Sequence, residues 1–264
     1  MRDLRTALVQ GETVWHDAAA NREYYASLVR PLKGTVDVIV LPETFTSGFS
    51  NEAVRNAETM QDASVAWMLA LAREVDAAIT GSVVMRDGDR VFNRLLWATP
   101  EGLEGFYDKR HLFRMAGEHE RYAAGRDRLV VEWRDWRICP LVCYDLRFPV
   151  FSRNFQAADG RMDFDLLLYV ANWPQARRTA WRTLLRARAV ENLCYVAGVN
   201  RVGKDGNAID YAGDSAVIDF LGETLCELGA TAQATPVRLD AGALAAHRSR
   251  FPAWMDADRF ELVD

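Results

Sequence analysis

The sequence lacks the features that would place a protein in a membrane or outside the cell. Within its 264 residues no run approaches the roughly 20 consecutive apolar residues of a membrane-spanning helix, and the longest apolar runs, such as residues 166–171, have the length of a strand. The residues that follow Met1 form no apolar stretch of the secretory-signal type, and no Asn-x-Ser/Thr acceptor site is present. The sequence therefore predicts a cytoplasmic protein.

Cysteine is scarce, and its four positions exclude a disulfide framework. The chain contains Cys139, Cys143, Cys194 and Cys226, too few to staple a chain of this length. Cys139 and Cys143 share one strand-like run, in which four residues span about 13 Å, further than a disulfide reaches. Their spacing also differs from that of a zinc site. We therefore expect no metal.

Two further absences limit the partners. The chain contains neither Gly-x-x-x-x-Gly-Lys-Ser/Thr nor Gly-x-Gly-x-x-Gly, the glycine-rich loops that bind nucleotide phosphates. Its formal net charge is −5, which gives no reason to expect a basic face for nucleic acid or for anionic lipid. The sequence thus predicts neither a nucleic-acid partner nor a membrane partner.

The composition is that of a globular protein, with 50% apolar and 26% charged residues. Short apolar runs alternate with longer helical patterns, which predicts an α/β fold. The predicted strands are residues 4–10, 36–41, 78–85, 92–98, 137–143, 165–171, 194–200, 215–219 and 236–239. The predicted helices are residues 17–32, 62–75, 151–158 and 178–192, with Asp17 and Asp62 as N-caps. Because no linker, repeat or low-complexity tract interrupts the chain, residues 1–264 are predicted to form a single domain.

Two connections stand out between these elements. Residues 83–85 and 91–96 flank a polar turn with a glycine at residues 86–90, which predicts a β-hairpin. The segment 108–128 is long and charged. Long polar loops inside compact domains are often functional, so this segment is a candidate for part of a site.

Cys143 is the first candidate for chemistry. It ends the apolar run 137–143 and is followed by Tyr-Asp-Leu-Arg-Phe-Pro, where the strand pattern breaks. A thiol at a strand end, beside free backbone N–H groups, acquires a lowered pKa and becomes a nucleophile. An isolated cysteine is more often a small buried core residue, so its partners decide the interpretation.

A cysteine nucleophile needs a base and a group that stabilises the developing oxyanion. Glu43 follows the apolar run 36–41, and this predicts a position at the carboxyl end of a strand, where α/β sheets bind ligands. Lys109 supplies a cation. Each of these residues on its own would be interpreted as a surface residue. Their combination with Cys143 favours a catalytic site.

The three motifs together resemble those of the nitrilase superfamily of carbon–nitrogen hydrolases. Glu43 follows Leu-Pro, Lys109 lies in Asp-Lys-Arg-His-Leu-Phe and Cys143 opens Cys-Tyr-Asp-Leu-Arg-Phe-Pro, in the order and spacing of that family. The resemblance continues through Asn172-Trp173-Pro174, residues 186–192 and residues 213–215. It implies a single carbon–nitrogen hydrolase domain with a four-layer α-β-β-α sandwich fold. It also implies a homodimer that needs no cofactor.

The resemblance also implies a role for each residue. Glu43 would be the general base and later the acid, Lys109 would stabilise the oxyanion, and Cys143 would form a thioester with the substrate. The family has a further glutamate shortly after the lysine; Glu118 matches it by spacing, and Glu120 is the alternative. Crowding two carboxyl groups into one pocket should raise the affinity of one of them for a proton.

The substrate side of the site follows from the same resemblance. The backbone N–H of Tyr144 would complete the oxyanion hole. Residues 41–49 and 143–151 are most similar to the omega-amidase branch, whose members hydrolyse the terminal amide of 2-oxoglutaramate and 2-oxosuccinamate to the oxo-dicarboxylate and ammonia. A cation should bind the distant carboxylate of such a substrate, and the candidates are Arg147, Arg177, Arg178 and Arg201. Phe45, Phe49 and Trp173 are candidates for the apolar walls of the site, and the alternative for each of them is a place in the core.

Three alternatives are open at this point. A carbamoylase, a nitrilase or an amidase for aliphatic or peptide-like amides would use the same residues on another substrate. A Cys–His hydrolase would pair Cys143 with His111 or His119, two residues that otherwise belong to the surface of a loop. A catalytically silent relative would be a binding protein, but the presence of Glu43, Lys109 and Cys143 together argues against it.

Overall fold

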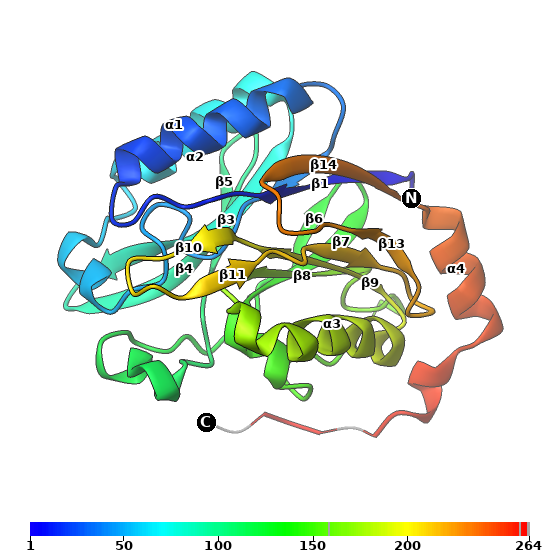
Figure 1. The fold of residues 1–264 in the computed structure, drawn as a ribbon. Helices are drawn as coiled ribbons and strands as arrows, with labels where there is room; N and C mark the ends of the chain where they lie inside the picture. Colours follow the sequence, from blue (N-terminus) through cyan, green and yellow to red (C-terminus); the bar gives the residue numbers. More distant parts are fainter. Residues whose placement is uncertain (158, 259, 263–264) are drawn as a thin grey trace.

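Two six-stranded sheets packed face to face form the centre of the computed structural model, which describes residues 1–157, 159–258 and 260–262 (Figure 1). The first sheet has the order β14 (Gln233–Leu239), β1 (Leu4–Gln10), β2 (Val38–Val40), β3 (Ala78–Asp87), β4 (Arg90–Ala98) and β5 (Leu103–Asp108). The second has the order β13 (Thr224–Glu227), β12 (Ala216–Ile218), β9 (Tyr195–Asn200), β8 (Leu166–Ala171), β7 (Trp136–Val142) and β6 (Val131–Trp133). A separate hairpin consists of β10 (Val202–Lys204) and β11 (Asp210–Ala212).

Helices cover the two outer faces of this pair of sheets. Figure 1 shows α1 (Ala18–Val29) and α2 (Ala63–Val75) on the first sheet and α3 (Arg178–Asn192) on the second, while α4 (Ala241–Arg250) follows β14 at one end. The predicted four-layer α-β-β-α sandwich is therefore confirmed. In the part of the chain that the structure describes, no helix is both long and apolar enough to cross a bilayer.

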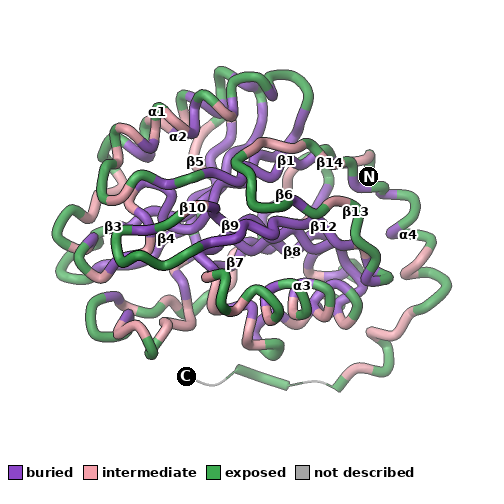
Figure 2. Tube along the Cα trace, in the orientation of Figure 1, coloured by how far each residue is buried: buried purple, intermediate pink, exposed green. Residues whose placement is uncertain are grey.

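The alternation of side chains along a strand explains the layers. In β1, Leu4 and Leu8 join the cluster of buried residues between the two sheets, while Ala7 and Val9 join the cluster beneath α1 and α2. Figure 2 shows the central strands as the most continuously buried part of the chain. Burial on both faces accounts for the almost unbroken apolar runs that identify these strands in the sequence.

Several local predictions are confirmed and others are wrong. Asp17 caps α1 by accepting a hydrogen bond from the N–H of Ala20 at 2.9 Å. Asp62 occupies the predicted N-cap position of α2, but its carboxylate accepts from the N–H of Thr59 at 2.6 Å and not from an N–H of the helix. The predicted hairpin is β3–β4, and its turn is only Gly88-Asp89, because residues 86, 87 and 90 pair within the strands. The strands β5, β6, β10, β11 and β13 and the helix α4 were not predicted.

The helix predicted for residues 151–158 is wrong over the described residues 151–157, and Ala158 lies outside them. This segment forms turns and extended backbone, because its backbone pairs with the chain that follows it. The carbonyl of Phe155 accepts from the N–H of Asp163 at 2.7 Å, and the N–H of Ala157 donates to the carbonyl of Arg161 at 2.7 Å. These bonds replace the intrahelical ones.

Candidate active site

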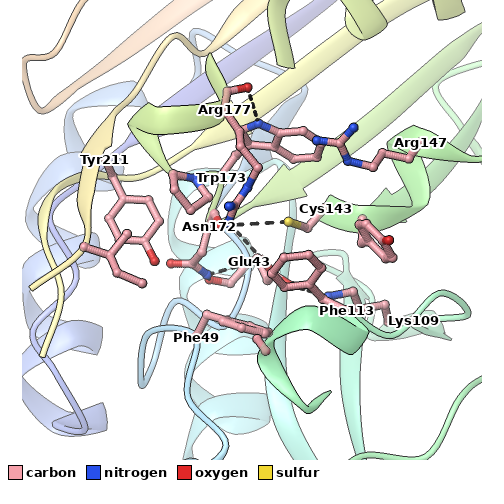
Figure 3. A pocket seen from close by; sticks show the side chains of 14 residues that line it. Glu43, Phe49, Lys109, Phe113, Cys143, Arg147, Asn172, Trp173, Arg177 and Tyr211 are labelled. Carbon is pink, nitrogen blue, oxygen red and sulfur yellow. Dashed lines mark hydrogen bonds and ion pairs between the residues drawn. The ribbon is translucent and has the colours of Figure 1, made fainter. Parts of the chain in front are cut away.

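Four strands that end at one edge of the sandwich bring the candidate residues together. Glu43 follows β2 by three residues, and Lys109, Cys143 and Asn172 directly follow β5, β7 and β8. All four line one pocket, with about 520 Å³ of empty space including its open mouth. Figure 3 shows their side chains converging there from both sheets. The structure thus unites the three residues of the predicted triad.

Cys143 lies at a sharp turn between β7 and the 3-10 helix Cys143–Arg147. Its φ is +45°, a left-handed conformation that is uncommon for residues other than glycine and that clusters at functional sites. The next residue, Tyr144, lines the same pocket. Because the first N–H groups of a helical turn have no acceptor within the turn, the Tyr144 amide suits an anion beside the thiol.

The buried carboxylate of Asp145 holds this turn against the segment that carries Lys109. Its Oδ2 accepts from the N–H of Val142 at 2.9 Å and from the hydroxyl of Tyr107 at 2.8 Å. Its Oδ1 accepts from the backbone N–H of His111 at 3.0 Å and lies 2.7 Å from the ring Nδ1. His111 is therefore a partner of Asp145, and within the described residues Cys143 forms no hydrogen bond with a histidine, its Sγ lying 4.0 Å from the carbonyl oxygen of Asn172.

A buried ammonium lies between two buried carboxylates. Lys109 Nζ donates to Glu43 Oε1 at 2.9 Å and to both oxygens of Glu118 at 3.0 Å, and each of the three residues is at most 1% exposed. Glu120 is exposed, so Glu118 is the glutamate that reaches Lys109. Across the described ranges, no three His, Cys, Asp or Glu side chains are arranged to hold a metal ion.

The electrostatics of this cluster follow from burial and mutual charge. Burial favours a lower pKa for Lys109, but the charges of Glu118 and Glu43 outweigh it and raise that pKa well above its usual value. Burial raises the pKa of Glu118; the charge of Lys109 opposes this shift and the charge of Glu43 adds to it. Burial and the charge of Glu43 likewise raise the pKa of the Cys143 thiol, against the influence of Lys109, so the lowered pKa expected from its place at a strand end is wrong. At rest Cys143 is therefore protonated, and attack on a substrate requires a base.

Two asparagines that the sequence reasoning did not assign to the site orient Glu43. Asn93, in β4, donates through Nδ2 to Glu43 Oε1 at 2.8 Å. Asn172 donates through its backbone N–H to Glu43 Oε2 at 2.8 Å, and through Nδ2 to the Glu43 carbonyl at 2.7 Å. Asn172 stands in a motif shared with the nitrilase superfamily, so a signal for it was present. No sequence feature pointed to Asn93, because a single polar residue in an apolar strand fits the usual alternation of polar and apolar side chains.

Of the four candidate arginines, Arg147 and Arg177 line the pocket. The guanidinium of Arg147 lies 4.9 Å from the ring of Trp173, and that of Arg177 lies 5.2 Å from the ring of Phe113. Neither forms an ion pair with a residue in the described part of the chain. Stacking on an aromatic face leaves the planar fork of a guanidinium free to bind a carboxylate.

The other two candidates have partners elsewhere. Arg178 forms an ion pair with Asp214 at 2.7 Å. Arg201 is fully buried and donates to the carbonyls of Val202 and Thr13, both at 3.2 Å. Arg147 and Arg177 are therefore the candidates that lie at the pocket, whereas Arg178 and Arg201 do not line it.

The apolar walls differ in part from the expected ones. Phe49 and Trp173 line the pocket, and the Phe49 ring lies 5.2 Å from Lys109 Nζ. Phe45 is a core residue, fully buried and tilted against Trp67 at 5.5 Å between ring centroids. The pocket also includes Phe113, Ala116, Pro174, Ile209 and Tyr211, none of which was assigned to it from the sequence.

Comparison with known proteins agrees with this geometry. The sequence pattern of the carbon–nitrogen hydrolase family matches residues 5–246. The chain belongs to the carbon–nitrogen hydrolase family. It is 51% identical to the omega-amidase YafV of Escherichia coli strain K12, over 99% of this chain and all of the relative. It is 32% identical to the 2-oxoglutaramate amidase of Bacillus subtilis strain 168, over 83% of this chain and 84% of the relative.

A solved structure extends the comparison to three dimensions. A CN-hydrolase superfamily protein from Xanthomonas campestris, determined with an arsenic adduct in its active site, is 61% identical and superimposes with a TM-score of 0.98 over all of both chains. The prediction of the nitrilase superfamily and of its omega-amidase branch is confirmed. This carbon–nitrogen hydrolase is an amidase, which settles the alternative of a silent binding relative.

Proposed function

We propose that the protein hydrolyses the terminal amide of 2-oxoglutaramate and 2-oxosuccinamate to the oxo-dicarboxylate and ammonia. One observation carries the proposal: Cys143 and the buried Glu43 and Lys109 share their pocket with two guanidinium groups, Arg147 and Arg177, that have no ion-pair partner within the described ranges. The cluster suits amide cleavage, and the guanidinium groups suit a carboxylate at the other end of a small substrate. Similarity to omega-amidases and to a 2-oxoglutaramate amidase supports this substrate class.

In the first half of the reaction, Cys143 attacks the amide. Glu43 takes the thiol proton while Sγ forms a bond to the carbonyl carbon and the π electrons move onto the carbonyl oxygen. The Lys109 ammonium and the backbone N–H of Tyr144 stabilise this oxyanion. When the carbon–nitrogen bond breaks, protonated Glu43 gives its proton to the departing nitrogen. Ammonia leaves, and a thioester of Cys143 remains.

In the second half, water hydrolyses the thioester. Glu43 accepts a proton from the water, whose oxygen attacks the thioester carbon, and the thiol of Cys143 is reprotonated as the acid leaves. Glu118 keeps Lys109 in place and charged, because it binds the ammonium through both oxygens at 3.0 Å. No step of this reaction consumes a cofactor.

A substrate panel with one arginine variant tests the proposal. We expect 2-oxoglutaramate to be hydrolysed faster than uncharged aliphatic amides, N-carbamoyl compounds or nitriles. Arg147→Leu should raise the KM for 2-oxoglutaramate about 10- to 100-fold, the effect of one charge-assisted hydrogen-bonded contact, and leave turnover of an uncharged amide unchanged. Arg178→Leu is the matched control, since this residue pairs with Asp214 outside the pocket. Preference of the wild type for a carbamoyl compound or a nitrile would overturn the substrate assignment.

We also infer that the protein acts as a cytoplasmic homodimer, as the family resemblance implies. Sedimentation at micromolar concentration should then give a species of twice the 29.8 kDa chain mass. A single species at the chain mass would contradict the dimer.

A further inference from the structure

The two oxygens of Glu43 accept hydrogen bonds unequally. Oε1 accepts two short bonds, from Asn93 Nδ2 at 2.8 Å and from Lys109 Nζ at 2.9 Å. Oε2 accepts one short bond, from the N–H of Asn172 at 2.8 Å. Since a carboxylate oxygen offers about two lone pairs, Oε1 is fully occupied and Oε2 retains one lone pair.

A second contact of Asn172 does not alter this count. Its Nδ2 lies 3.5 Å from Glu43 Oε2, at the limit of a hydrogen bond. The same Nδ2 donates at 2.7 Å to the Glu43 carbonyl and at 3.0 Å to the hydroxyl oxygen of Thr44, and these bonds use both of its hydrogens. The lone pair on Oε2 therefore stays available.

The oxygen with the free lone pair is bound by the same residue that contacts the thiol. The N–H of Asn172 binds Oε2, and its carbonyl oxygen lies 4.0 Å from Cys143 Sγ. One residue thus contacts both the carboxylate oxygen and the sulfur. A hydrogen bond that the thiol donates to the Glu43 carboxylate also contributes to the raised pKa of Cys143.

Asn93 contributes to the site only through its donor end. It is buried, at 1% exposure, and does not line the pocket. Its Oδ1 is buried and finds no hydrogen-bond partner among the described residues. An apolar side chain would avoid the cost of that unpaired oxygen, so stability alone does not explain an amide here. The reverse amide orientation would place Oδ1 against the Glu43 carboxylate, and the charge therefore fixes Nδ2 as the donor.

We propose that Asn93 is a positioning residue: with Lys109 it occupies Glu43 Oε1, so that the thiol proton of Cys143 passes to Oε2. This inference rests on the proposed role of Glu43 as the base. In the step, the S–H bond breaks and an O–H bond forms at Oε2. The sulfur electron pair forms the bond to the amide carbon, and the carbonyl π pair moves onto oxygen. Two donors on Oε1 keep the carboxylate from rotating away from the sulfur.

The pH dependence of kcat/KM in Asn93 variants tests the proposal. Asn93→Ala removes a donor from the ionised carboxylate, so the acid limb should move up by about one pH unit and kcat should fall about tenfold, with little change in KM. Asn93→Asp places a second carboxyl group there, and the shift should be larger. Thr80→Val is the matched control, because Thr80 is a buried residue of the adjacent strand β3 whose hydroxyl has no partner within the described residues. It should leave the limb in place.

The outcomes separate this inference from the proposed function. An acid limb that stays at the wild-type pH in both variants would overturn the role of Asn93. If Asn93→Ala does not fold, Asn93→Ser keeps a hydroxyl donor and should give a smaller shift of the acid limb in the same direction. An unshifted acid limb in Asn93→Ser would also overturn the role of Asn93. If Glu43→Gln retains turnover, the proposed function itself fails. An inactive Glu43→Gln beside unshifted Asn93 variants refutes only the positioning role.

Discussion

Replacing Lys109 by methionine removes a positive charge from between two buried carboxylates. The ammonium lies 2.9 Å from Glu43 and 3.0 Å from Glu118, and the side chains are at most 1% exposed. Removing one partner of a buried ion pair costs about 3–5 kcal/mol, because the charge left behind is uncompensated. We therefore expect Lys109→Met to lower the free energy of unfolding by about this amount at neutral pH, and the midpoint of thermal unfolding by about 10 °C.

The size of this loss should depend on pH, because Glu118 can take up a proton. Burial raises the pKa of Glu118 above its unfolded value of 4.5, with Lys109 opposing the shift, so loss of Lys109 raises it further. A group whose pKa is higher in the folded than in the unfolded protein contributes stability that is fully present at pH values below the unfolded pKa. This contribution is lost as the pH rises through the folded pKa. The deficit of Lys109→Met should therefore be smaller at about pH 5 than at about pH 8.

Urea unfolding at these two pH values measures the deficit directly. The matched variant is Lys109→Met combined with Glu118→Gln, which removes one of the two carboxylates and should recover much of the lost stability. Equal deficits at both pH values, or a Lys109→Met protein as stable as the wild type, would refute the electrostatic reasoning.

Two further predictions concern the surroundings of the cluster. His111→Asn should lower stability, since His111 binds Asp145, but should keep activity within about tenfold of the wild type; complete loss of activity would favour a Cys–His hydrolase. Gly125→Ala should destabilise the protein by about 1–3 kcal/mol and reduce turnover, because the new Cβ would lie 2.1 Å from the backbone oxygen of Asp108. Gly229→Ala has no atom within 4 Å of the new Cβ and serves as its control, and equal behaviour of the two glycine variants would contradict the prediction.

The sequence predicted those parts of the fold that are buried on both faces. The strands before Glu43 and Cys143 were found as apolar runs, because both faces of each sheet are covered by other layers. The strand β5 before Lys109 was not predicted, because most of its residues are exposed or half-buried and its apolar pattern is therefore weak. The 151–158 helix was wrong because backbone pairing with residues 161–163 cannot be read from helical periodicity.

The candidate site divides in the same way. The triad residues stand in recognisable motifs, and each comes after a strand that ends at the same edge of the sandwich. The choice among the arginines depends on which of them have partners, and that requires the tertiary structure. Asn93 reaches a carboxylate 50 residues earlier in the chain, a contact that no local pattern encodes.

The most direct test of the central claim is the release of ammonia from 2-oxoglutaramate, measured side by side for the wild type and for Cys143→Ala. Cys143 is partly exposed in the pocket, so the alanine variant should fold and unfold like the wild type, and this is checked in the same preparation. We expect release by the wild type and none by Cys143→Ala. Equal release by both proteins would contradict the thioester mechanism, and absence of release from both would contradict the proposed substrate.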